Sequence, residues 1–386
     1  MRSGETLRRY RIGLMFSTTG PYAALGRSAR DGALMALEEV NAGDVSGVAG
    51  LQLDPVTADP GGIPSDYERL TAAMLEGGGV RHIVGGITSW SRKDMIPVLE
   101  RHAALLWYPC PYEGFECNDH VVYLGACPNQ HLVPLVDHVL AAGARRAFLV
   151  GSNYVWGWET LRVARERLSA RGVEVAAERF VPLGGTDCAR LIEEIDNHGP
   201  DLIVNSLIGP SNHAFLQALA QHREQGAPCL VVSANQTEAD LPDLGPAADG
   251  LLSMGAWFES VEGPDTAGFR ARIAARYGED YRASCFFATA YAGVRLLAKG
   301  LALAGTDDPR AVFAAVAGAP RQTVLGRVTI DPVTRHTSLI PRLAVARGGI
   351  FQILADAGEA LAPDPYLTRV APAAPLRRAP DLRIVS

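Results

Sequence analysis

The sequence has little basic charge and almost no lysine. Its 386 residues include 36 lysines and arginines against 42 aspartates and glutamates, which gives a formal net charge of −6. Lys93 and Lys299 are its only lysines. This balance provides no basic surface of the kind that binds a phosphate backbone. Direct binding to nucleic acid is therefore not expected.

The cysteine spacings of metal sites and the glycine-rich signatures of cofactor sites are also missing. The six cysteines show neither a C-x-x-C pair nor the flanking histidines of a zinc site. No G-x-G-x-x-G turn follows a predicted strand, and neither a G-K-[ST] phosphate loop nor a G-x-S-x-G elbow is present. We therefore expect mostly buried thiols, with no metal and no cofactor.

Long apolar runs are absent as well. Near the N-terminus the longest run, residues 12–16, is too short for the hydrophobic region of a signal peptide. No run of about eighteen apolar residues occurs elsewhere. These features predict no membrane insertion and a cytoplasmic location. A periplasmic location is the alternative, if a signal peptide has been removed.

What the sequence does contain is a regular alternation of strand and helix patterns. With 48% hydrophobic and 20% charged residues, it has the composition of about two or three globular domains. Tight alternation of this kind predicts an α/β fold with mostly parallel sheets and helices on both faces. Strands are predicted at 11–16, 51–58, 80–84, 105–107, 147–151, 173–181, 201–206, 228–233 and 251–254, with a C-terminal hairpin at 340–346 and 350–354. The segment 121–130 is predicted to be irregular.

The stretch from Ile83 to Glu116 contains the first candidate site. A strand ends in Gly85-Gly86, and the [ST]-x-x-[DE] pattern of Ser91 and Asp94 predicts a capped helix start there. A similar pattern predicts a capping box at 65–68 for the preceding helix. The next strand ends at the sequence YPCPY, residues 108–112. Ligands of open parallel sheets bind outside the carboxyl ends of the strands, so both strand ends are candidate binding segments.

Several phrases of the sequence resemble a known family. The phrases RIGLMFSTTGPYA, GGITSWSRKDMIPVLER, LLWYPCPYEGFE, ACPNQ, LVGSNYVWGWE and PDPYL resemble the type I periplasmic-binding-protein fold, which also includes the Leu/Ile/Val-binding proteins. Within it they are most similar to the AmiC-like amide-sensing regulators of amidase expression, and to the substrate-binding proteins of amide and urea transporters. The resemblance implies two Rossmann-like lobes joined by three hinge crossings. The N-terminal lobe would comprise residues 1–127 and 254–328, and the C-terminal lobe 128–253 and 329–386.

The resemblance also implies a set of ligand-binding residues. They are Ser89, Tyr108 and Cys110 in the first lobe, and Tyr154, Trp156, Asn235 and Gln236 in the second. A neutral amide needs donors for its oxygen and acceptors for its NH2, which uncharged Ser, Tyr and Asn side chains supply. Cys110 and Trp156 stand where the family motif has threonine and tyrosine. Acetamide is therefore expected to bind poorly, and a larger planar amide is favoured.

Two functions follow from the resemblance. The first is a cytoplasmic sensor of a small neutral amide or urea-like molecule, which controls amidase-type genes by sequestering an RNA-binding antitermination protein until the ligand arrives. The alternative is the substrate-binding protein of an ABC transporter for short-chain amides or urea. The sequence leaves open whether the chain forms a homo-oligomer.

An amide-hydrolysing enzyme is the competing class. Cys110 would be its nucleophile, and such a thiol needs a base or a lowered pKa. Only Glu113 or His102 could serve, and only if the fold brought one of them close. We therefore expect no catalytic residues and no enzymatic activity.

Overall fold

The computed structural model describes residues 7–223, 229–263, 265–369 and 376–378 of the chain. The chain forms two compact units. Unit 1 comprises Met1–Pro111, Glu116–Gly125 and Phe286–Ser338, and unit 2 comprises Tyr112–Phe115, Ala126–Cys285 and Leu339–Ser386. These units are defined by contacts between residues and do not test the lobe boundaries predicted from the sequence. Those boundaries therefore stay a prediction. Each unit is described by itself.

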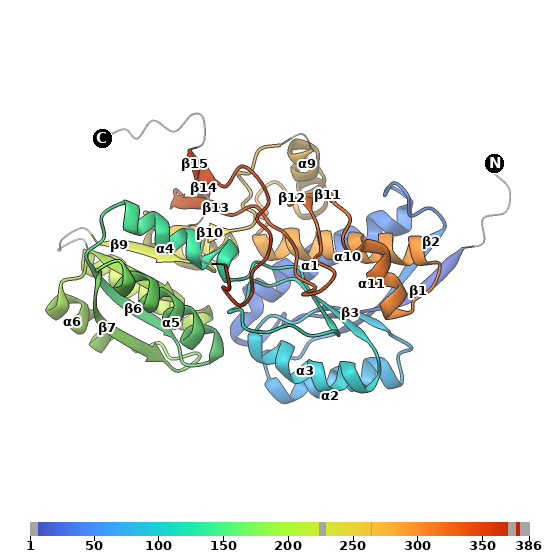
Figure 1. Cartoon of the computed structure of the whole chain (residues 1–386), viewed down its shortest axis with the longest axis horizontal. Helices are drawn as coiled ribbons and strands as arrows, with labels where there is room; N and C mark the ends of the chain where they lie inside the picture. Colours follow the sequence, from blue (N-terminus) through green and yellow to red (C-terminus); the bar gives the residue numbers. More distant parts are fainter. Residues whose placement is uncertain (1–6, 224–228, 264, 370–375, 379–386) are drawn as a thin grey trace. The chain divides into compact units, whose positions relative to one another are not determined.

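Unit 1 is built on a five-stranded parallel sheet in the order β2-β1-β3-β4-β5 (Figure 1). The strands are β1 (Arg8–Met15), β2 (Leu51–Ala58), β3 (His82–Gly85), β4 (Leu105–Tyr108) and β5 (Val121–Tyr123). The strand order reverses between β1 and β3. Such a switch point leaves a crevice at the carboxyl ends of the two strands.

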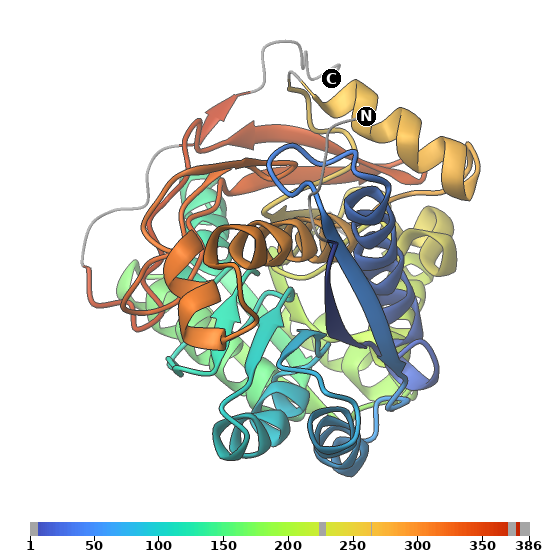
Figure 2. The same cartoon turned by 90° about the vertical axis from the view of Figure 1, so that its right-hand side faces the viewer.

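Helices cover both faces of this sheet, because right-handed crossovers change face where the strand order reverses. The helices are α1 (Ala23–Ala42), α2 (Pro64–Glu76), α3 (Ser89–Arg101), α10 (Cys285–Ala304) and α11 (Pro309–Val316), and a short hairpin of β11 (Arg321–Thr323) and β12 (Gly326–Val328) follows. Figure 2 shows α1 beside α10, and α2 beside α3. The contact of α1 with α10 is close, because a Cβ atom on Gly32 would lie 2.2 Å from the carbonyl oxygen of Phe287.

One described helix, α10, is long and apolar enough to span a membrane by length and composition. However, 78% of its most apolar 18-residue window is buried inside the structure. The buried core helix of a folded protein passes the same test.

Unit 2 contains an eight-stranded sheet in the order β15-β14-β13-β10-β9-β8-β6-β7. Its strands are β6 (Arg146–Ser152), β7 (Glu174–Val181), β8 (Leu202–Ser206), β9 (Leu230–Ser233), β10 (Leu252–Gly255), β13 (Arg342–Arg347), β14 (Ile350–Asp356) and β15 (Arg377–Arg378). Strands β7 to β10 run parallel to β6, while β13, β14 and β15 each pair with the preceding strand of the sheet in antiparallel orientation. The order reverses between β6 and β8, as it does between β1 and β3 in unit 1.

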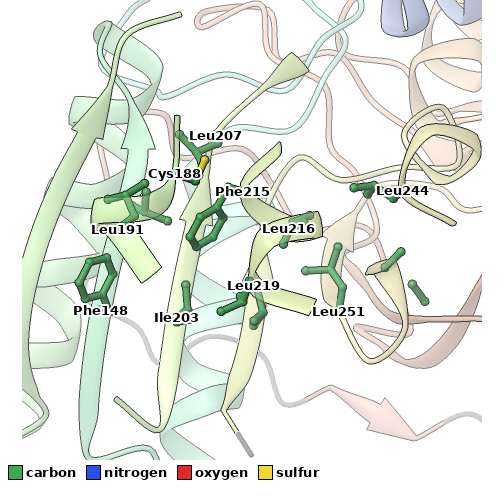
Figure 3. Packing of buried hydrophobic residues seen from close by; sticks show 14 of the residues in the cluster. Phe148, Cys188, Leu191, Ile203, Leu207, Phe215, Leu216, Leu219, Leu244 and Leu251 are labelled. Atoms are coloured by element: carbon green, nitrogen blue, oxygen red, sulfur yellow. The ribbon is translucent and has the colours of Figure 1, made fainter. Parts of the chain in front are cut away.

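Two apolar layers hold unit 2 together, one on each face of its sheet. The helices are α4 (Leu132–Ala141), α5 (Val155–Ala170), α6 (Ala189–His198), α7 (Gly209–Arg223), α8 (Leu241–Leu244) and α9 (Thr266–Tyr277). On one face α5 packs against β6 and α4 against β10, and Leu135, Leu149 and Leu161 belong to the same buried apolar cluster. On the other face Phe148 points the opposite way and joins Leu191 of α6 and Phe215 of α7 (Figure 3).

The predicted fold class is confirmed, and the local errors have simple causes. Strand β5 lies within the segment predicted to be irregular, because three residues are too few to show a periodicity. The predicted capping box at 65–68 is wrong. Helix α2 has Ile63 at its N-cap without a side-chain cap, and begins with Pro64, whose fixed φ suits a first helical turn.

Candidate functional site

In unit 1 the ends of β1, β3 and β4 meet at one edge of the sheet. Met15 pairs with Gly85 in the register of β1 and β3, and Val84 pairs with Trp107 in that of β3 and β4. The segments that follow these strands are therefore neighbours. They contain Ser17 after β1, and the predicted residues Ser89 and Cys110 after β3 and β4.

Two glycines let the chain turn closely at the end of β3. The backbone N–H of Gly86 donates to Met15 O at 2.9 Å. A Cβ on Gly85, whose φ is +152°, would lie 2.0 Å from the same oxygen. Gly86 has a φ of +78°, which favours glycine. The turn therefore brings the amino end of α3 directly to the edge of the sheet.

Thr88 caps α3, so the predicted cap formed by Ser91 and Asp94 is wrong. Thr88 Oγ1 accepts a hydrogen bond from the N–H of Ser91 at 3.1 Å, and Ser91 Oγ accepts one from the N–H of Thr88 at 3.1 Å. This reciprocal pair satisfies two amides of the first turn. Ser89 consequently occupies the first helical position, where its side chain is buried and the cap does not need it.

Cys110 and Tyr108 lie at the end of β4 and are both buried. The thiol of Cys110 donates to Gly86 O at a sulfur–oxygen distance of 3.3 Å, which joins the β4 end to the β3 end. His102 lies at the other end of α3, about 20 Å away along a helix of this length. It is therefore too far from the β4 end to act as a base for Cys110.

A buried ion pair lies beside Tyr108. The guanidinium carbon of Arg92 is 4.9 Å from the centre of the Tyr108 ring. Arg92 Nε donates to Glu116 Oε1 at 2.6 Å, Lys93 Nζ to Glu116 Oε2 at 2.6 Å, and the Tyr123 hydroxyl to Glu116 Oε1 at 2.9 Å. Burial opposes the ionisation of Glu116, but Arg92 and Lys93 outweigh it and lower the pKa of Glu116 to about 2. The carboxylate is thus fully charged at neutral pH.

Sequence reasoning missed this ion pair and a pair of hydroxyls at the end of β1. Ser17 Oγ and Tyr67 Oη share a hydrogen bond of 2.5 Å, and Ser17 Oγ also accepts from the N–H of Gly62 at 2.8 Å. Burial raises the pKa of Tyr67, and nearby Cys110 raises it further, so the phenol stays neutral. The only signal was the position of Ser17 directly after a strand, in the phrase FSTTG.

In unit 2 the switch point lies between β6 and β8. Tyr154, two residues beyond β6, occupies the N-cap position of α5, and its backbone N–H donates to Ser152 O at 2.8 Å. Its side chain is buried. Trp156 lies in the first turn of α5, also buried, and its indole Nε1 has no hydrogen-bond partner among the described residues.

The amide groups of Asn235 and Gln236 belong to an internal network beyond β9. Asn235 Oδ1 accepts from Ser233 Oγ at 2.8 Å, and Asn235 Nδ2 donates to Leu207 O at 3.2 Å. Gln236 Oε1 accepts from Asn212 Nδ2 at 2.9 Å. These contacts occupy both ends of the Asn235 amide and the acceptor of Gln236. Among the described residues, the Nε2 group of Gln236 takes no part in this network.

The predicted ligand-binding residues are serine, tyrosine, cysteine, tryptophan, asparagine and glutamine, none of which has a formally charged side chain. One carboxyl group, that of Glu238, is buried two residues beyond Gln236, and burial raises its pKa to about 8. Within the described residues, no three His, Cys, Asp or Glu side chains gather as a metal site would require. All six cysteines are thiols, and four of them are buried. The predicted residues can therefore offer hydrogen bonds to a neutral ligand, and the nearby charges of Arg92 and Glu116 are paired with each other.

Comparison with known proteins decides the family. The sequence matches the family described as periplasmic binding protein domain over residues 10–372. The chain belongs to this family. Its members are binding proteins, so the prediction that the chain is not an enzyme is confirmed, and small-molecule binding is its function in the broad sense.

Relatives of this periplasmic-binding-protein chain bind amino acids or aromatic acids. The Leu/Ile/Val-binding protein homolog 6 of Brucella abortus (strain 2308) is 24% identical over 342 residues, which cover 84% of each chain. A solute-binding protein of an R. palustris ABC transporter, solved with 4-hydroxybenzoate, has a TM-score of 0.80 at 23% identity, covering 90% of this chain and 95% of that one. A branched-chain amino acid transporter substrate-binding protein of Streptococcus pneumoniae, solved with isoleucine, has a TM-score of 0.79 at 19% identity, covering 92% and 100%.

Proposed function

We propose that the chain binds a small neutral molecule with a planar, amide-like head through polar side chains at its strand ends. The single observation that supports this ligand class is the neutrality of the predicted residues. In unit 1 they are Ser89, Tyr108 and Cys110, and in unit 2 Tyr154, Trp156, Asn235 and Gln236. Uncharged side chains can pair the donors and acceptors of an amide without leaving a buried charge unpaired.

The proposed biological role is delivery of this ligand to an ABC transporter. The relative from Brucella is named a Leu/Ile/Val-binding protein homolog, and the two similar solved structures are a solute-binding and a substrate-binding protein of transporters. The second candidate is the amide sensor that sequesters an RNA-binding antitermination protein. It is supported by the motifs S-x-S-RK and YPCPYEGFE, residues 89–93 and 108–116, which resemble the amide-sensing branch.

A thermal-shift screen of the full chain tests the ligand class. The panel contains acetamide, longer aliphatic amides, benzamide, urea, benzoate and leucine. A ligand present at 100 times its Kd adds about 2.7 kcal/mol to the stability of the folded form, which raises Tm by about 5–10 °C for units of this size. We expect the largest shift from a neutral amide other than acetamide. A largest shift from leucine, from benzoate or from acetamide would refute the proposed ligand class.

Cys110 and Trp156 account for the expected rejection of acetamide. A thiol is a weak hydrogen-bonding group, so a ligand that would use the threonine hydroxyl of the family motif loses about 0.5–1.5 kcal/mol. Replacing Cys110 by Thr should then strengthen acetamide binding by about threefold to tenfold. Calorimetry with acetamide measures this change, and Cys127→Ser provides a control at another buried cysteine.

Cell fractionation separates the two roles. A transport role requires the protein outside the inner membrane, whereas a sensor acts in the cytoplasm, the location predicted from the sequence. A sensor would also show reciprocal coupling. If the protein partner lowers the affinity for the ligand by some factor, the ligand must lower the affinity for the partner by the same factor. A cytoplasmic protein whose ligand affinity falls when its protein partner is added would establish the sensor and exclude delivery to a transporter.

A further inference from the structure

Two neighbouring aromatic rings of unit 2 each have a buried polar atom without a partner among the described residues. His131 lies directly before α4, and its ring centre is 5.7 Å from that of Trp156 on α5, with the two planes inclined by 37°. His131 Nδ1 and Trp156 Nε1 are both buried and have no hydrogen-bond partner among the described residues. More than about nine in ten buried polar groups in folded proteins are paired. Two adjacent exceptions point to a polar group that the described residues do not supply.

The protonation of His131 follows from its other nitrogen. His131 Nε2 lies 3.0 Å from the backbone oxygen of Tyr112. A carbonyl oxygen only accepts, so Nε2 carries the proton and donates it. Burial lowers the pKa of His131 to about 4, so the ring is neutral at pH 7. Nδ1 therefore presents a lone pair, which makes it an acceptor.

Trp156 presents the opposite hydrogen-bonding character. An indole Nε1 carries a hydrogen and can only donate. The pair therefore offers one acceptor and one donor on neighbouring buried rings. A primary amide matches both, since its N–H can donate to His131 Nδ1 while its oxygen accepts from Trp156 Nε1. A carboxylate matches only the tryptophan, because its oxygens and the His131 lone pair would repel each other.

We propose that His131 and Trp156 form a donor–acceptor pair that recognises the head group of the ligand and discriminates an amide from the carboxylate of the same shape. This inference rests on the proposed function, since it names the residues that select the neutral ligand. It adds His131, which no sequence motif singled out, and it gives Trp156 a defined atom for the contact.

Benzamide and benzoate are suitable probes because they differ only in the head group. Isothermal titration of the full chain at pH 7 should give a Kd for benzamide at least tenfold lower than that for benzoate. Trp156→Phe keeps the ring and removes the donor, and we expect it to weaken benzamide binding about tenfold. Trp158→Phe is the matched control. Trp158 is 46% exposed and its Nε1 already donates to Asn153 Oδ1 at 3.0 Å, so this variant should leave the affinity unchanged.

Two replacements of His131 separate ligand recognition from a structural role. In His131→Gln the side-chain nitrogen takes the place of Nε2, which keeps the bond to Tyr112 O and removes the acceptor. In His131→Asn the side-chain oxygen takes the place of Nδ1, which keeps the acceptor and loses the bond to Tyr112. We expect Gln to weaken benzamide binding about tenfold, and Asn to stay within about threefold of the wild type. A structural role alone would give the reverse order, in affinity and in the Tm of the protein without ligand.

The outcomes distinguish this inference from the proposed function. If amides bind the wild type but Trp156→Phe and His131→Gln bind benzamide within twofold of it, a water molecule occupies the pair and the inference is overturned while the function stands. Tighter binding of benzoate than of benzamide also overturns the inference. If no amide of the panel gives a saturable response, both the inference and the proposed function fail.

Discussion

Replacing Glu116 by Gln should destabilise the protein by about 3 kcal/mol at pH 7. The side chain of Arg92 is fully buried, and the side chain of its partner Glu116 is 13% exposed. Removing one member of a buried ion pair leaves the other charge uncompensated, which typically costs about 3–5 kcal/mol. The second partner, Lys93, is 42% exposed and loses little.

The pKa of Glu116 gives a similar magnitude by an independent route. Its value falls from the ordinary 4.5 to about 2 in the folded protein. At about 1.4 kcal/mol per pKa unit, this difference corresponds to about 3 kcal/mol of stability at neutral pH. Because the pKa is depressed by folding, this stability is present above pH 4.5 and is lost as the pH falls from 4.5 towards 2. The difference between wild type and E116Q should therefore shrink by about 1.4 kcal/mol between pH 7 and pH 3.5.

Urea unfolding at 25 °C, followed at several pH values, measures both effects. Asp54→Asn is the matched control, because Asp54 also binds an arginine through two hydrogen bonds, yet the side chains of Arg9 and Asp54 are 63% and 37% exposed. Exposed pairs contribute about 0–1 kcal/mol. The reasoning is wrong if E116Q costs no more than Asp54→Asn, or if its cost does not decrease at low pH.

Three further changes test the packing and the buried charge. Gly32→Ala should lower the free energy of unfolding in urea by about 1–3 kcal/mol, because its Cβ would lie 2.2 Å from Phe287 O. The control Gly268→Ala, in an exposed part of α9, should be neutral or stabilising. Equal effects of the two variants would refute the close approach of α1 and α10. Phe215→Ala should cost about 3–5 kcal/mol, since Phe215 is fully buried in the layer shown in Figure 3, and a cost below 1 kcal/mol would contradict that packing. Glu238→Gln should stabilise the protein at pH 7 to 8. Burial raises the pKa of Glu238 to about 8, so the stability of the wild type falls as the pH rises from 4.5 to 8. If urea unfolding shows the same pH dependence for the variant and the wild type, Glu238 is already ionised in the folded protein.

The sequence alone determined the order of the elements and the class of the fold. Strand patterns at 51–58 and 173–181 predicted β2 and β7, which the structure has at Leu51–Ala58 and Glu174–Val181. The hairpin of β13 and β14 followed from Gly348-Gly349, both of which have a positive φ. These features depend on residues that are close in sequence, and local patterns report them directly. The sequence also named strand-end residues as candidates, because chain order and parallel pairing bring such ends to one edge of a sheet.

Only the tertiary structure decided how those candidates are used. Whether the Asn235 amide is free to bind depends on Leu207, 28 residues away, which accepts from its Nδ2. The buried pair of Arg92 and Glu116 joins residues 24 positions apart. His131 and Trp156 likewise come from different elements, and their unpartnered nitrogens become visible only when every neighbour is in place. Burial and hydrogen-bond satisfaction are properties of the whole packed surroundings, so no local pattern of residues can specify them.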